Sequence, residues 1–177
     1  MIEHILVPID GSDHAWKALD IACILAQSAK ADLTMVHIAT DRPLSEDEQR
    51  FASVEFPAEL HDSLNFSELA RVSGSVESSA RLAMKQYSEA SEALRGAIGN
   101  TLIEEGRARA HEHGLADVKG TVLYGDPAQQ ILDYAQKHGN DTIIMGSRGL
   151  GTLEELWLGS VSHKVSNMAR CSCMTVK

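Results

Sequence analysis

Residues 145–162 of this 177-residue chain combine residue types and a spacing that suit phosphate binding. The glycines, and the serine after the last of them, are spaced as Gly146-x2-Gly149-x9-Gly159-Ser160. Glycine lets the backbone approach a ligand closely, and a helix that begins at Ser160 would offer free N–H groups and the positive end of its dipole. The hydroxyls of Ser160 and Ser162 add donors. The stretch therefore predicts a phosphate site; the alternative is a turn that only connects two strands.

Two better-known phosphate-binding loops do not match this stretch. A P-loop needs Lys-Ser or Lys-Thr after its last glycine, whereas Gly151 is followed by Thr152-Leu153. The dinucleotide fingerprint needs a glycine three residues after its second one, and Glu154 occupies that place. The spacing is therefore that of a different glycine-rich loop.

The elements that must position this loop begin with a strand–helix–strand unit. The short apolar run 4–9 ends at Asp10-Gly11-Ser12, where Ser12 is the natural N-cap of a helix over 12–29. A second strand is expected at 33–38. Strands in such a unit are parallel and their crossover is right-handed. From its position alone, Asp10 could simply cap this first helix.

The C-terminal half of the chain repeats this order. Strands are expected at 118–123, 141–145 and 173–176, and helices at 128–138 and 160–169. Pro127 marks the start of the first of these helices and Gly139 its end. Apolar runs of this kind are typical of a sheet covered on both faces. The sequence thus predicts one α/β domain over 1–177, an open doubly wound fold with about five parallel strands.

The middle of the chain has a weaker pattern. Residues 43–75 carry seven acidic and two basic side chains with no clean period, which predicts an irregular, partly helical excursion that lengthens the second crossover. Helical spacing resumes at Glu77 and extends toward His113, although Gly96 and Gly99 weaken the case for one unbroken helix.

Composition and charge narrow the function. Sixteen basic against 25 acidic side chains give a net charge of −9, which argues against nucleic acid as a partner. No apolar run is long enough to span a membrane, and the first residues do not resemble a signal peptide. Three cysteines do not make a secreted disulfide framework. A cytoplasmic location is expected.

The other reactive side chains predict no catalytic or metal site. His37, near a strand end, is more typical of a hydrogen-bonded core histidine than of a base. His111 and His113 would face different directions on one helix, so they are a poor metal pair. Cys171 and Cys173 supply at most two thiolates, too few for a zinc site.

Together these residues resemble the universal stress protein family, in its ATP-binding branch. The branch's motif Gly-x2-Gly-x9-Gly-Ser/Thr is complete here, and residues 5–12 (ILVPIDGS) resemble the family's first strand and acidic turn. Val36-His37-Ile38 resembles the end of its second strand, and Gly125-Asp126-Pro127 the turn before its third helix. The resemblance covers about 1–42 and 97–177. It implies a parallel sheet in the order 3-2-1-4-5, adenine nucleotide alpha hydrolase-like, with nucleotide at the switch point between strands one and four.

The resemblance also implies a role for individual residues. Asp10 would accept hydrogen bonds from the ribose hydroxyls, Pro8 would shape that wall, and the backbone at Ile38 would meet the adenine edge. Met145 and Gly146 would lie beneath the ribose, Arg148 and Gly149 on the phosphate loop, and the phosphates would be cradled by Gly159, Ser160, Val161 and Ser162. A Mg²⁺ ion would bridge phosphate oxygens, because it prefers phosphate and water to an all-protein cage.

The implied function is an ATP-binding stress-response or signalling homodimer whose conformation or protein partner depends on the bound nucleotide, with AMP or ADP as alternatives to ATP. The segment 43–96 is the candidate for the responsive part. Ser172 stands where the family often has proline, in a strand that commonly pairs across the dimer. Two other functions stay open. One is slow ATP hydrolysis or nucleotidyl transfer at the same site, where Arg148 is the only obvious cation; the other is a protein-interaction module without nucleotide.

Overall fold

The computed structural model describes residues 1–40, 50, 53–54, 77–150 and 158–177, with only the backbone over 77–90. The chain divides into two compact units, one made of Met1–Asp41 and Gly99–Lys177 and the other of Arg42–Ile98. The expected excursion at 43–75 lies almost entirely outside the described residues, so its form stays a prediction. The first unit contains the sheet and every predicted binding residue.

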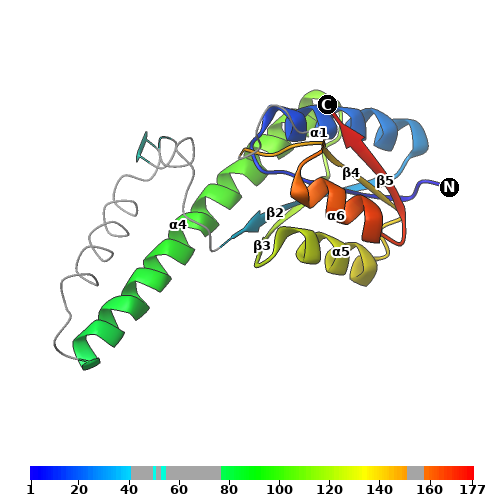
Figure 1. Ribbon diagram of the computed structural model, residues 1–177. Helices are drawn as coiled ribbons and strands as arrows, with labels where there is room; N and C mark the ends of the chain where they lie inside the picture. The colour runs from blue at the N-terminus through cyan, green and yellow to red at the C-terminus, as the bar shows by residue number, and fades with distance from the viewer. Residues whose placement is uncertain (41–49, 51–52, 55–76, 151–157) are drawn as a thin grey trace. The chain divides into compact units, whose positions relative to one another are not determined.

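The described strands of this unit form one parallel five-stranded sheet (Figure 1). In chain order the strands are β1 (His4–Pro8), β2 (Asp32–Ala39), β3 (Lys119–Tyr124), β4 (Thr142–Gly146) and β5 (Ser172–Val176). Their order across the sheet is β3-β2-β1-β4-β5. The doubly wound fold with order 3-2-1-4-5 is confirmed.

The central strand explains why the sheet needs covering on both faces. In β1, Ile5 pairs with Leu33 of β2 on one side and with Thr142 of β4 on the other. Successive side chains of a strand point to opposite faces, yet Ile5, Leu6 and Val7 are all fully buried. A strand of this kind is stable only where helices exclude water from both faces.

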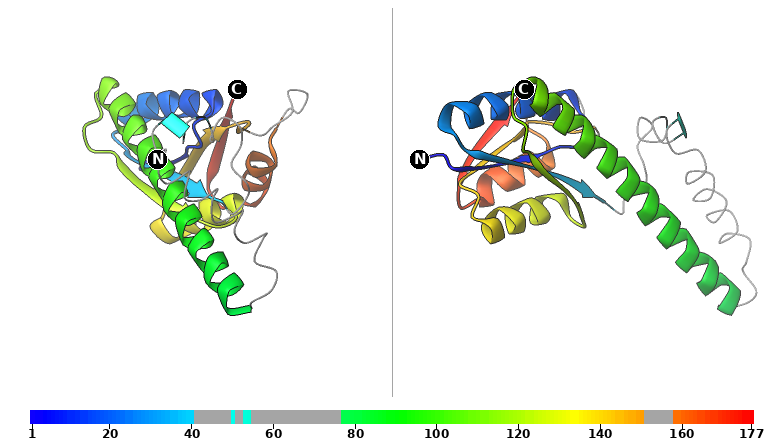
Figure 2. Two further views of the ribbon diagram at one scale, coloured as in Figure 1. Left: turned by 90° about the vertical axis from the view of Figure 1, so that its left-hand side faces the viewer. Right: turned by 180° about the vertical axis from the view of Figure 1, so that it is seen from behind.

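Helices pack on both faces of the sheet, as the two views in Figure 2 show. They are α1 (Asp13–Ala29) and the part of α4 (Glu77–Glu112) from Gly99 onward on one face, and α5 (Pro127–His138) and α6 (Ser160–Met168) on the other. Ile5 and Val7 pack into the core beneath α1 and α4, whereas Leu6 packs with Ile131 of α5 and Val165 of α6.

Local sequence sets the helix ends, and the predicted roles of Ser12 and Gly139 are confirmed. The Ser12 hydroxyl caps α1 by accepting from the Ala15 amide at 3.2 Å. The Asp126 carboxylate caps α5 by accepting from the Gln129 amide at 2.9 Å. Gly139 ends α5 in the left-handed conformation that glycine adopts without strain.

The helical pattern predicted from Glu77 forms one helix, because α4 continues through Gly96 and Gly99 to Glu112. A Cβ at Gly99 would lie 2.7 Å from Cδ2 of His37, and one at Gly106 would lie 2.6 Å from the sulfur of Met35. The glycines therefore let this part of α4 approach the sheet closely. The helix-propensity cost of a glycine, about 1 kcal/mol, is offset by that packing.

A charged cluster joins α1 to the C-terminal end of α4. The Arg109 guanidinium donates to both carboxylate oxygens of Asp20, at 2.6 and 2.8 Å, and lies 6.0 Å from the centre of the Trp16 ring. His113 Nε2 is 3.0 Å from Asp20 Oδ1. The arginine hydrogen bonds, and secondarily that of His113, hold the pKa of Asp20 below its usual value. Among the described residues, no helix is both long and apolar enough to cross a membrane.

Candidate functional site

The strand order creates a switch point between β1 and β4. The chain leaves β1 toward β2 and leaves β4 toward β5, so the two connections run to opposite sides of the sheet. In doubly wound sheets, ligands bind in the crevice that this divergence opens at the carboxyl ends of the strands. Pro8 is the last residue of β1, and Met145 and Gly146 are the last residues of β4. Three predicted residues therefore end the two strands that meet at the switch point.

Asp10 lies in the turn after β1 with one carboxylate oxygen engaged and the other available. Oδ1 accepts from the Ser12 amide at 3.0 Å and from the Ser12 hydroxyl at 2.6 Å. Ser12, and not Asp10, then caps α1. No described residue donates a hydrogen bond to Asp10 Oδ2. Asp10 therefore holds the cap residue with one oxygen and keeps an acceptor for another donor.

Gly149 brings the loop after β4 against this carboxylate. A Cβ built on Gly149 would collide with Asp10 Oδ2, and the backbone oxygen of Arg148 lies 3.4 Å from the Ser12 hydroxyl oxygen. Gly146 serves a different contact, since its Cβ would lie 2.9 Å from the backbone nitrogen of Ala15 at the start of α1. Both glycines of the motif's first half are thus needed for close approach, one at the carboxylate and one against a helix.

The carbonyl of Ser147 ties the end of β4 to the start of α6. It accepts from the Gly159 amide and from the Ser162 hydroxyl, each at 2.7 Å. The Ser147 amide in turn donates to the carbonyl of Val176 in β5 at 2.7 Å. These bonds fix both ends of the loop, whose residues 151–157 lie outside the described part of the chain. Ser147 was absent from the predicted site, although it falls within the glycine motif.

The N-terminus of α6 carries no side-chain cap. Gly159 is the N-cap residue and offers no side-chain acceptor to the first-turn amides. Its Cβ would make only ordinary contacts, the nearest being 3.4 Å from the Ser147 carbonyl, and its φ of −70° suits any residue. Packing of the described residues therefore does not require glycine here, whereas the approach of a ligand to the amides of Ser160 and Val161 would.

The remaining predicted residues differ in their surroundings. The Ser162 hydroxyl is turned toward the Ser147 carbonyl and is almost fully buried, so only its amide is left to face a ligand. Ile38 lies near the end of β2, opposite Leu123 of β3, and packs against the core beneath α5 and α6. Met145 packs in the core beneath α5 and α6, and Arg148 is half-buried. The structure thus joins Asp10 to Gly149 and joins Gly159 to Ser162, and it places Ile38 on the neighbouring strand β2.

This part of the fold, which includes α6, contains an ion pair but, among the described residues, no cluster of metal ligands. Lys164 of α6 lies 3.1 Å from the Asp126 carboxylate. The hydrogen bond from the Gln129 amide, and secondarily that from Lys164, lowers the pKa of Asp126. In the described part of the chain, no three or more His, Cys, Asp or Glu side chains gather as a set of metal ligands.

Comparison with known proteins decides the family. All of the chain, residues 1–177, matches the universal stress protein family. The chain belongs to that family. It is 31% identical over 179 residues to the universal stress protein YxiE of Bacillus subtilis, with both proteins covered completely.

Solved structures of the family share the fold. The universal stress protein UspA from Lactobacillus plantarum superposes with a TM-score of 0.62 at 21% identity, covering 99% of this chain and 98% of the other. A universal stress protein in complex with cAMP gives 0.60 at 19% identity, covering 99% and 96%. A universal stress protein from Archaeoglobus fulgidus in complex with dAMP gives 0.55 at 17%, with both chains covered completely.

Proposed function

We propose that this chain binds an adenine nucleotide, ATP in the first instance, in the crevice between the ends of β1 and β4 and the start of α6. The observation that carries the proposal is the meeting of Asp10 with Gly149. Two segments far apart in the sequence place an available carboxylate oxygen against a backbone that has no side chain. A sugar hydroxyl is the kind of donor that a carboxylate oxygen binds well.

The phosphate end of the ligand is supported by α6. Its uncapped N-terminus carries the positive end of the helix dipole, and the Ser147 carbonyl holds it beside the end of β4. Phosphates would accept from the amides of Ser160, Val161 and Ser162, and a Mg²⁺ ion bound with them would offset part of their negative charge. A nucleotide carries both a sugar and phosphates, so a turn that binds a sugar and a helix end that binds phosphate together suit a nucleotide.

The relatives support the adenine part of the proposal, since members of the family have been solved with cAMP and with dAMP. The proposal includes Pro8 as a wall of the ribose site, Met145 and Gly146 beneath the ribose, and the Ile38 backbone at the adenine edge. It also includes AMP or ADP as alternative residents, a homodimer, a nucleotide-dependent protein partner and a cytoplasmic stress-response role.

The first test is the content of the purified protein. Denaturation followed by chromatography and mass spectrometry is expected to release an adenine nucleotide in near-stoichiometric amount, and nucleotide-free protein is expected to bind Mg-ATP in a calorimetric titration. A protein that neither contains an adenine nucleotide nor binds added Mg-ATP would overturn the proposal.

A matched pair of variants then tests the site. Asp10→Asn preserves an oxygen for the Ser12 donors but replaces the other acceptor with an amide, so ATP affinity should fall about tenfold or more. Asp13→Asn makes the same change of charge at an exposed position in the first turn of α1 and should leave the affinity within about twofold. Equal losses from both variants would assign the effect to net charge instead of to Asp10.

A further inference from the structure

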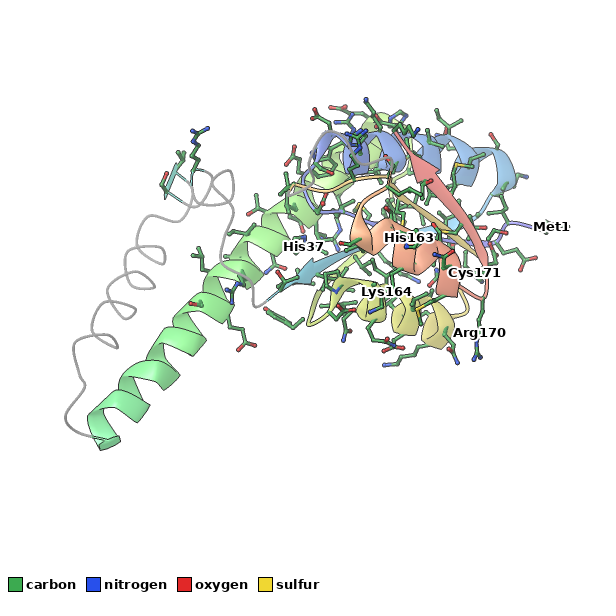
Figure 3. The ribbon with its side chains drawn as sticks, in the orientation of Figure 1. Met1, His37, His163, Lys164, Arg170 and Cys171 are labelled. Carbon is green, nitrogen blue, oxygen red and sulfur yellow. The ribbon has the colours of Figure 1, made fainter. Side chains whose placement is uncertain are left out.

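The buried side chain of His37, in β2, contacts the residue that precedes Asp10. Its Nδ1 lies 3.0 Å from the backbone oxygen of Ile9, and the residue is only 8% exposed. A carbonyl oxygen only accepts, so Nδ1 must carry the proton. Figure 3 shows His37 beside α4, on the sheet side of that helix. The sequence predicts a hydrogen-bonded core histidine, and the structure shows that the ring bonds to the Ile9 carbonyl.

Ile9 is the point at which backbone pairing between β1 and β2 ends. Its amide donates to the Val36 carbonyl at 2.9 Å, the last backbone bond of the pair, and its carbonyl is taken by the His37 side chain. Adjacent residues of β2 therefore fix both polar backbone groups of Ile9. Because Asp10 comes next, the direction in which the chain leaves the sheet toward Asp10 depends on the His37 hydrogen bond.

The ring also lies close to α4 and β3. A Cβ on Gly99 of α4 would lie 2.7 Å from Cδ2 of His37 and 2.9 Å from Cγ2 of Val122 in β3. A ring confined by β3 and α4 has little freedom to leave the Ile9 carbonyl. If packing were its only task, an apolar side chain would fill this space without the cost of burying a polar group.

We propose that His37 is a positioning residue for the ribose end of the nucleotide site, holding Asp10 through the Ile9 carbonyl so that Oδ2 meets the sugar hydroxyls. This inference rests on the proposed nucleotide binding and extends it. His37 touches no ligand, yet it sets how strongly the site prefers a nucleotide with ribose hydroxyls to one without them. The preference arises because Oδ2 is the acceptor that no described residue uses.

The test compares two substitutions of nearly equal size, His37→Asn and His37→Leu. The asparagine amide can reach the Ile9 carbonyl and donate to it, whereas leucine cannot. The affinities of full-length wild type and variants for ATP and for 2′,3′-dideoxy-ATP, which lacks both sugar hydroxyls, are measured by calorimetry. Thermal unfolding of each protein reports whether the fold survives.

The wild type should bind ATP at least tenfold more tightly than dideoxy-ATP. His37→Leu should reduce this preference about tenfold by weakening ATP alone, and His37→Asn should retain it within about threefold. If His37→Leu weakens both nucleotides equally, or leaves the preference unchanged, the positioning role is overturned while nucleotide binding stands. A wild type that binds neither nucleotide overturns the proposed function, and this inference with it.

Gly99→Ala supplies a second variant in case His37→Leu does not fold. The added methyl group displaces the ring without removing its donor, and the same selective loss of ATP over dideoxy-ATP is expected. A folded Gly99→Ala protein with an unchanged preference would contradict the proposal.

Discussion

At the scale of single residues, the three glycines of the motif lie in different surroundings. Gly146 makes room for the backbone of α1, Gly149 makes room for the Asp10 carboxylate, and Gly159 meets only ordinary contacts. None of these three has a positive φ, so an alanine at each tests space and not backbone strain.

Gly149→Ala is expected to weaken ATP binding about tenfold or more, because its methyl group would displace the Asp10 oxygen that we assign to the sugar. A carboxylate at the end of a side chain can rotate away, so the midpoint of thermal unfolding should change by only a few degrees. Calorimetric titration and thermal unfolding of the same samples check both statements. Unchanged affinity in a folded variant would separate Gly149 from the ligand.

At the scale of elements, the parts of the fold that could be predicted depend on neighbours in the sequence. Ser12 and Asp126 cap helices, and Gly139 ends one, through contacts within a few residues of themselves. The unbroken α4 could not be predicted, since the space that Gly99 leaves is filled by His37 and Val122 from two distant strands.

In the candidate site too, some features can be predicted from the sequence and others depend on contacts between distant residues. The spacing of its glycines can be seen in the sequence, but the contact of Gly149 with Asp10 requires β1 and β4 to be neighbours. The direction of the Ser162 hydroxyl depends on the Ser147 carbonyl, which only the folded loop places beside it.

The cluster between α1 and α4 makes a pH-dependent contribution to stability. Hydrogen bonds from Arg109, and secondarily His113, lower the pKa of Asp20 in the folded protein. Its stabilising effect is therefore present above the unfolded value of about 4 and is lost as the pH falls through the lower folded value. Asp20→Asn should cost about 1 kcal/mol of unfolding free energy near neutral pH, since the pair is partly exposed, and less as the solution is acidified.

Urea unfolding at several pH values between about 2.5 and 7 measures this difference. Asp32→Asn is the control, because Asp32 is largely exposed and its neighbour His4 is 3.6 Å away. That variant should differ from the wild type by less than about 0.5 kcal/mol at every pH. If the loss from Asp20→Asn were constant down to the acid end, the lowered pKa would not be the source of the stabilisation.

At the scale of the whole molecule, the proposed homodimer needs a surface, and β5 offers one. It lies at the end of the strand order and pairs with β4 alone among the described strands. Met174 in the middle of β5 is 41% exposed, and an exposed apolar edge strand is a template for pairing with another chain. Ser172 stands at the start of β5, where its backbone amide donates to the Asp141 carbonyl at 3.0 Å, a bond that the proline frequent in the family would lack.

If two copies pair through β5, a charged substitution in that strand should weaken the dimer. Met174→Lys would place two ammonium groups in the shared interface, whose burial and mutual repulsion should raise the dimer dissociation constant at least tenfold. Ile24→Lys adds the same charge at an exposed site on α1, on the face of the sheet away from α5 and α6, and should leave assembly unchanged. Light scattering across a concentration series distinguishes the two variants. A Met174→Lys protein that remains as dimeric as the wild type would exclude β5 as the interface. Because the residues of the proposed nucleotide site come from one chain, neither result would count against nucleotide binding.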